Sequence, residues 1–172
     1  MSFKGAMLSS ASNEWRTPQA LYDALHDEFR FTLDAAATAD NAKCDKYITA
    51  EDDALAMDWH AMTPGYWRQT GERTVSVWCN PPYGRGVGQW VKKAYEESLK
   101  GCRVVVLVMA RVDTLWWHHW ATKAAEIRLI KGRVWFEHDD KAQCASPSPS
   151  AVLVFDEARR RPVISHVELP RR

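Results

Sequence analysis

The tetrapeptide Asn80-Pro81-Pro82-Tyr83 directly follows the apolar run VSVWC. The amide oxygen of Asn80 accepts hydrogen bonds. Pro81 has a fixed φ and no N–H, so its carbonyl oxygen can be aimed at a ligand. These two oxygens can each accept one hydrogen of a planar exocyclic amine and draw its nitrogen toward a tetrahedral geometry, while Tyr83 stacks on the base. We therefore predict an amine clamp; the alternative is a rigid proline turn in which Tyr83 only packs.

Acidic residues stand at the ends of two further predicted strands. FTLDAAA reads as a short strand that ends in an acid at Asp34, and the cluster Glu51, Asp52 and Asp53 comes at the end of KYIT. In open α/β sheets, ligands bind beyond the carboxyl ends of the strands. We therefore expect these acids and Asn80 to converge on one crevice. The alternatives are that Asp34 caps a turn and that Asp53 belongs to a solvated acidic loop.

Helices and strands that could position these residues alternate over the first two-thirds of the chain. Helices are predicted over 17–29, 89–101 and 114–124, and strands over 31–37, 46–49, 75–79, 103–109, 126–130, 133–137, 150–156 and 163–169. Thr17 is the expected N-cap, Pro18 the first helical residue, and Lys92 and Lys93 belong to a solvated helix face. The alternation predicts an α/β fold with a doubly wound, mostly parallel sheet, and the strand-rich C-terminal part predicts an antiparallel edge.

Length and composition narrow the class of protein. The 172 residues predict a loose arm over 1–12 and a single domain over 13–172. The formal net charge of +1 excludes a diffuse basic field, so contacts with a polyanion must be local. None of the four cysteines forms a Cys-x-x-Cys pair, and we expect no metal. No apolar leader or long apolar run is present, which predicts a soluble cytoplasmic protein.

Seven segments spread over most of the chain carry a family resemblance. They are EWRTPQALYDALHDEFRFTLDAAAT, NAKCDKYIT, DALAMDW, WCNPPYG, WVKKAYE, ARVDTLWWH and IKGRVWF, in this order between Asn13 and Phe155. Together they resemble the phage-type Dam family of DNA N6-adenine methyltransferases. The tetrapeptide alone also occurs in enzymes that methylate RNA, protein glutamine or cytosine amines. The resemblance implies a Rossmann-like methyltransferase fold with S-adenosylmethionine as cofactor.

The resemblance also implies a cofactor site. Its expected members are Thr17, Pro18, Asp34, Ala35, Asp53 and Asp58. Thr17 and Pro18 would line the methionine end, and Asp34 would face the amino acid end. Asp53, with Asp52 as second choice, would bind the ribose hydroxyls, and Asp58 would accept from the adenine amine. Three alanines follow Asp34 where a glycine-rich loop is usual in methyltransferases, and an alanine allows a less close approach than a glycine.

Basic and aromatic residues are candidates for contact with nucleic acid. Arg111 follows the predicted strand 103–109, where it would meet a phosphate, and Trp116 or Trp117 would pack against an extruded nucleotide. The alternative for the tryptophans is the apolar face of a helix. Arg133 either contacts DNA or pairs with a carboxylate.

The expected activity is methyl transfer to the N6 amine of an adenine flipped out of double-stranded DNA. Asn80, Pro81, Pro82 and Tyr83 are the expected catalytic residues. Two alternatives stay open: methylation of another planar amine (an RNA base, cytosine N4 or protein glutamine), and a catalytically silent nucleic-acid-binding protein of the same fold. A monomer in the cytoplasm of a bacterial host is expected.

Overall fold

The computed structural model describes residues 15–63, 74–137, 143–159 and 163–168. The α-helices are α1 (Gln19–Phe29), α3 (Val87–Leu99) and α4 (Leu115–His119), and 3₁₀ turns span Ala50–Asp52, Ala121–Lys123 and Glu157–Arg159. The strands are β1 (Leu33–Asp34), β2 (Ser76–Cys79), β3 (Arg103–Met109), β4 (Glu126–Lys131), β5 (Trp135–Glu137), β6 (Gln143–Ala145), β7 (Ser150–Phe155) and β8 (Val163–Glu168). Across these described ranges, no helix is both long enough and apolar enough to span a membrane.

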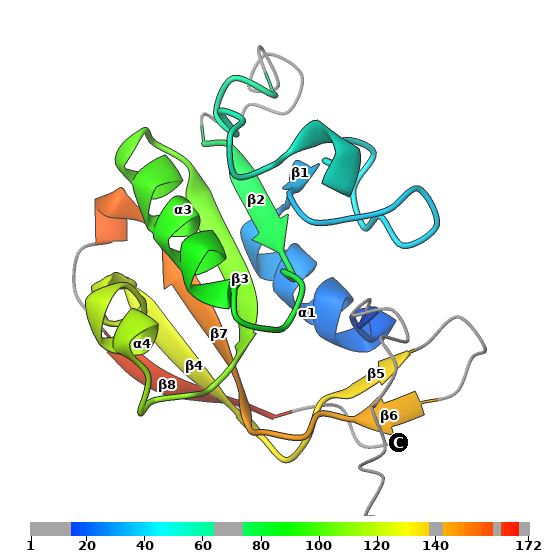
Figure 1. Cartoon of the computed structure of the whole chain (residues 1–172), viewed down its shortest axis with the longest axis vertical. Helices are drawn as coiled ribbons and strands as arrows, with labels where there is room; N and C mark the ends of the chain where they lie inside the picture. The colour runs from blue at the N-terminus through cyan, green and yellow to red at the C-terminus, as the bar shows by residue number, and fades with distance from the viewer. Residues whose placement is uncertain (1–14, 64–73, 138–142, 160–162, 169–172) are drawn as a thin grey trace, which may run out of the picture.

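Six strands form the central sheet in the order β1-β2-β3-β7-β4-β8 (Figure 1). Strand β7 pairs antiparallel with β3 and β4, and the other neighbouring pairs are parallel. The predicted α/β fold with a mostly parallel sheet is therefore confirmed. The position of the antiparallel strand needs a correction, because β7 lies inside the sheet. All six of its residues are buried, which suits an interior strand with both faces covered.

Helices cover both faces of this sheet. Helices α3 and α4 lie on one face and α1 on the other (Figure 1). Alternate residues of β3 face opposite sides: Val104, Val106 and Val108 pack in the core beneath α3 and α4, whereas Val105 and Leu107 pack in the core beneath α1. This period of two is expected for a strand buried on both faces. The result is a rigid three-layer frame with the carboxyl ends of β1, β2, β3 and β4 along one edge.

Local structure departs from the predictions at three places. Pro18, not Thr17, is the N-cap of α1, since its ψ of 131° is still extended. Segment 46–49 is not a strand: Tyr47 makes one isolated bridge to Asp34, and a 3₁₀ turn follows. The pair β5–β6 is a separate antiparallel ribbon, and β6 was not predicted. The predicted arm over 1–12 lies outside the described residues.

Candidate active site

A cavity of about 270 Å³ opens at the carboxyl ends of β1 and β2. Its walls are formed by the segment that precedes α1, by the chain after β1 as far as Leu55, by the end of β2 with the first three residues of the tetrapeptide, and by Trp90 of α3. Asp34, Asp53 and Asn80 all line it, although they are far apart in the sequence. Residues from two neighbouring parallel strands meet here because both strands end at the same edge of the sheet.

The amide of Asn80 is held at both ends. Its Nδ2 donates to the carbonyl oxygen of Trp15 at 2.6 Å, and its Oδ1 accepts from the hydroxyl of Tyr83 at 3.0 Å. These two contacts leave only one orientation of the amide in which both hydrogen bonds form. An amide oxygen has two lone pairs, so Oδ1 keeps one for a further donor. Pro81 and Pro82 line the cavity beside it.

Tyr83 does not line the cavity. Its ring makes edge contacts with Trp15, at 6.1 Å between centroids, and with Phe136, at 5.6 Å. Desolvation by burial raises the pKa of the phenol above its ordinary value, so the hydroxyl stays a donor. In this arrangement the side chain orients Asn80, and its ring is not in the cavity wall, where the predicted stacking on a base would require it.

Asp34 is a buried carboxylate in the cavity wall. Its Oδ1 accepts from the backbone N–H of Ala36 at 3.2 Å, and its Oδ2 accepts from that of Lys43 at 3.0 Å. Burial raises the pKa of Asp34 to about 6, although these two hydrogen bonds act in the opposite direction. Ala35 is completely buried and does not line the cavity, whereas Ala36 does. The alanine segment therefore forms the wall at the place where the resemblance implies a glycine-rich loop.

The acidic cluster after residue 49 separates into different roles. Asp53 lines the cavity and has a left-handed φ of 52°. The carboxylate of Asp52 accepts from the backbone N–H of Thr49 at 3.0 Å and from its hydroxyl at 2.8 Å, closing a capping box on the 3₁₀ turn. Glu51 is exposed and does not line the cavity. Only Asp53 of the three is placed to meet a ligand in this cavity.

Asp58 is not brought to the cavity. Its carboxylate accepts from Lys100 at 3.0 Å and from the backbone N–H of Ala61 at 3.0 Å. The hydrogen bond from Lys100 is the main cause that lowers the pKa of Asp58. The expected contact between this residue and the cofactor's adenine therefore needs correction, because its carboxylate faces α3 instead. Leu55 and Trp90 supply apolar surface to the cavity.

The segment before α1 contributes more than the sequence suggested. Thr17 is buried and lines the cavity, whereas Pro18 does not. Trp15 and Arg16 line it as well, and so do two residues from the loop after β1, Asn41 and Lys43. Asn41 and Lys43 could have been found from the sequence, because the segment NAKCDKYIT is rich in polar side chains and lies between Asp34 and Asp53, two acids predicted to face a ligand.

The predicted nucleic-acid contacts lie outside this cavity. Arg111 and Arg133 are exposed and follow β3 and β4, respectively. Trp135 of β5, which was not among the predicted contacts, has 45% of its surface exposed. Trp117 is buried in the core under α4, as the apolar-face alternative predicts. Trp116 is partly buried and packs closely on α3 at Gly88. A Cβ atom added to Gly88 would lie only 2.7 Å from the Cβ of Trp116.

Comparison with known proteins gives one consistent family. Residues 4–171 match the family described as DNA N-6-adenine-methyltransferase (Dam). The chain is 30% identical over 139 residues to the DNA N-6-adenine-methyltransferase of Escherichia phage T1, covering 80% of this chain and 50% of the phage protein. It is 26% identical over 161 residues to the DNA N-6-adenine-methyltransferase of Haemophilus phage HP1 (strain HP1c1), covering 91% of this chain and 86% of the phage protein. The chain thus spans about half the length of the T1 protein.

Proposed function

The chain belongs to the Dam family of DNA N-6-adenine-methyltransferases, and from this premise we propose that it transfers a methyl group from S-adenosylmethionine to the N6 amine of an adenine in double-stranded DNA. The observation that carries the proposal is the placement of Asn80. Its amide is oriented by two hydrogen bonds at the wall of a cavity that also contains the carboxylates of Asp34 and Asp53.

The residues of the cavity fit S-adenosylmethionine by their chemistry. When bound, this cofactor supplies an activated methyl group. The carboxylate of Asp34 is matched to the ammonium group of the methionine end, and Thr17 lines the same cavity. The carboxylate of Asp53 is an acceptor for ribose hydroxyls, as acids are in dinucleotide-binding folds. Leu55 and Trp90 offer apolar surface to a flat base.

The chain's own contribution to the reaction is positioning. Asn80 Oδ1 and the carbonyl oxygen of Pro81 each accept one hydrogen of the target amine, which directs the nitrogen lone pair away from the ring. Tyr83 holds the amide of Asn80 so that Oδ1 faces the amine. Pro81 and Pro82 restrict the backbone at this point, so little reorganisation is needed when the amine arrives.

The target adenine must leave the duplex, because its amine cannot reach this cavity while it is stacked and paired. We assign Arg111, Arg133 and Trp135 to a DNA-facing rim, and use this name for these three residues. All three are exposed beyond the carboxyl ends of β3 and β4. The arginines can neutralise phosphates locally, which suits a chain whose net charge is only +1. We propose that the chain acts as a monomer, since one chain supplies both the cavity and the rim, and that it works in the cytoplasm of a bacterial host.

The testing experiment identifies the methylated unit. Purified protein is incubated with methyl-labelled S-adenosylmethionine and, in separate reactions, unmethylated duplex DNA, RNA or protein, and each product is digested and resolved. We expect label in N6-methyladenine from DNA, and none with Asn80→Ala. Label in an RNA base, in N4-methylcytosine or in glutamine would replace the proposed substrate. Cofactor binding without transfer to any of them would indicate a catalytically silent protein of this fold.

A further inference from the structure

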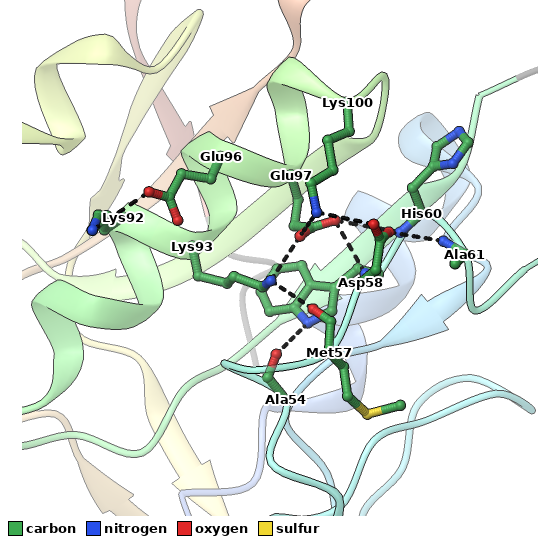
Figure 2. Close-up of polar contacts among 11 residues, drawn as sticks. Ala54, Met57, Asp58, His60, Ala61, Lys92, Lys93, Glu96, Glu97 and Lys100 are labelled. Atoms are coloured by element: carbon green, nitrogen blue, oxygen red, sulfur yellow. Dashed lines mark hydrogen bonds and ion pairs between the residues drawn. The ribbon is translucent and has the colours of Figure 1, made fainter.

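Glu97 of α3 is a completely buried carboxylate with partners on both oxygens. Its Oε2 accepts from the backbone N–H of Trp59 at 3.1 Å and from that of His60 at 3.4 Å. Its Oε1 pairs with Lys93 at 2.7 Å and with Lys100 at 2.9 Å (Figure 2). A buried charge is tolerated only when it is paired and hydrogen-bonded, so these four contacts explain why a carboxylate can occupy this position.

The same network reaches the wall of the cavity. The indole of Trp59 is fully buried, and its Nε1 donates to the carbonyl oxygen of Ala54 at 2.8 Å. Lys93 donates to the carbonyl oxygen of Met57 at 2.5 Å (Figure 2). Ala54 lines the cavity and directly follows Asp53, the acid assigned to the ribose. Residues 54–60 are thus fastened to α3 at several points, and Ala54 of this segment stands in the cavity wall.

We infer that Glu97 is a positioning residue of the cofactor site. It does not line the cavity, and it acts through the loop 54–60, which it anchors to α3. The inference rests on the proposed function, because it takes the cavity to hold S-adenosylmethionine. It also corrects the prediction for Lys93, which is not on a solvated face: 12% of its side chain is exposed, compared with 48% for Lys92.

The direct test is Glu97→Gln. A carboxamide has one acceptor oxygen and an NH₂ group, so it cannot accept from both backbone N–H groups and also pair with two ammonium groups. The loop should shift, and we expect the Kd for S-adenosylmethionine, measured by calorimetry, to rise about 10- to 100-fold, since small misplacements have effects of this size. The KM for the cofactor should rise in parallel, while kcat at saturating cofactor stays near the wild-type value.

Matched variants separate positioning from general loss of stability. Glu96→Gln removes the neighbouring exposed carboxylate, which pairs with Lys92, and should leave the Kd unchanged. Lys93→Met removes the bond to Met57 and should raise the Kd even if Glu97→Gln does not fold. Arg128→Met breaks another ion cluster whose members do not line the cavity; it should lower the melting temperature without changing the Kd.

The outcomes are distinguishable from failure of the proposed function. If the wild type binds S-adenosylmethionine and Lys93→Met and folded Glu97→Gln bind it equally well, the positioning role is wrong and the proposed function stands. An equal rise of the Kd in Arg128→Met would also overturn the positioning role, because any loss of stability would then have the same effect. If the wild type itself does not bind the cofactor, the proposed function fails.

Discussion

The cavity and the DNA-facing rim lie at the same edge of the sheet but are built in opposite ways. In the cavity, Asp34 and Asn80 are tied by hydrogen bonds to the backbone or to neighbouring side chains before any ligand arrives. Along the rim, Arg111 and Arg133 are exposed. Behind the cavity, the buried carboxylate of Glu97 adds another layer of support.

The difference fits the two kinds of ligand that we propose. A small ligand binds best in a largely pre-formed pocket with a few placed polar groups. A nucleic-acid backbone is a repeating charge, and exposed arginines can neutralise it without a rigid pocket. Substitutions in the cavity should therefore change chemistry or cofactor affinity by large factors, whereas those in the rim should change DNA affinity and its salt dependence by small ones.

The largest effect is expected for Asn80→Ala. It removes an acceptor for the target amine, and methyl transfer should fall by about 100- to 1000-fold, as when one polar group is lost from a preorganised site. Cofactor affinity, measured by calorimetry, should stay close to the wild-type value because Asn80 is assigned to the amine. Circular dichroism controls for folding, since Trp15 and Tyr83 lose a partner. A parallel loss of cofactor affinity would contradict this division of roles.

A pH dependence should follow from Asp34. Its pKa is raised from 3.8 to about 6 in the folded chain, so the folded state holds the proton more tightly than the unfolded one. Stability of the unliganded protein should therefore decrease as the pH rises between these values. Cofactor affinity should do the reverse, because the ammonium group favours the ionised carboxylate: about tenfold weaker binding is expected one unit below that pKa.

Asp34→Asn should weaken cofactor binding and abolish this pH dependence, as followed by calorimetry across the titration range. Asp52→Asn is the matched control, because the carboxylate of Asp52 bonds Thr49 and not the cavity. If Asp34→Asn keeps the wild-type pH profile, another group is responsible for it.

A smaller effect is expected for Tyr83→Phe. The ring and its contacts with Trp15 and Phe136 are kept, but the hydroxyl that orients Asn80 is lost. One hydrogen bond of ordinary strength corresponds to a decrease in kcat of about 3- to 10-fold. The Kd for the cofactor and the salt dependence of DNA binding should not change. An unaltered kcat would indicate that Tyr83 contributes only its ring.

The smallest effects belong to the rim. Arg111→Ala and Arg133→Ala should each reduce the slope of log affinity against log salt by about one unit, with only a modest loss of affinity. Binding to one duplex at several salt concentrations measures this, with Tyr83→Phe as the uncharged control. An unchanged slope for either arginine would remove that residue from the rim, and a large loss of kcat at saturating DNA would break the contrast between the two regions.

Local signals in the sequence were sufficient for much of the fold. Neighbouring residues alone predict the continuous apolar run of β3 and the helical spacing of α1 and α3. They also place Asp34 and Asn80 at strand ends, and the structure agrees with these predictions. Strand β6 was missed because its three residues carry little periodicity. Segment 46–49 has strand-like residues, but it makes a single bridge and turns away.

The α/β frame and the order of the segments that meet at its edge could be read from the chain alone, because side-chain periodicity and turn chemistry act over a few residues. Which acid enters the cavity depends on the folded arrangement, since Asp52, Asp53 and Asp58 differ in partners and not in type. The same holds for the hydrogen bond from Tyr83 to Asn80 and for the one from Trp59 to Glu97, 38 residues further along the chain. Such roles depend on which distant groups approach a side chain, and burial then requires that each polar atom find a partner.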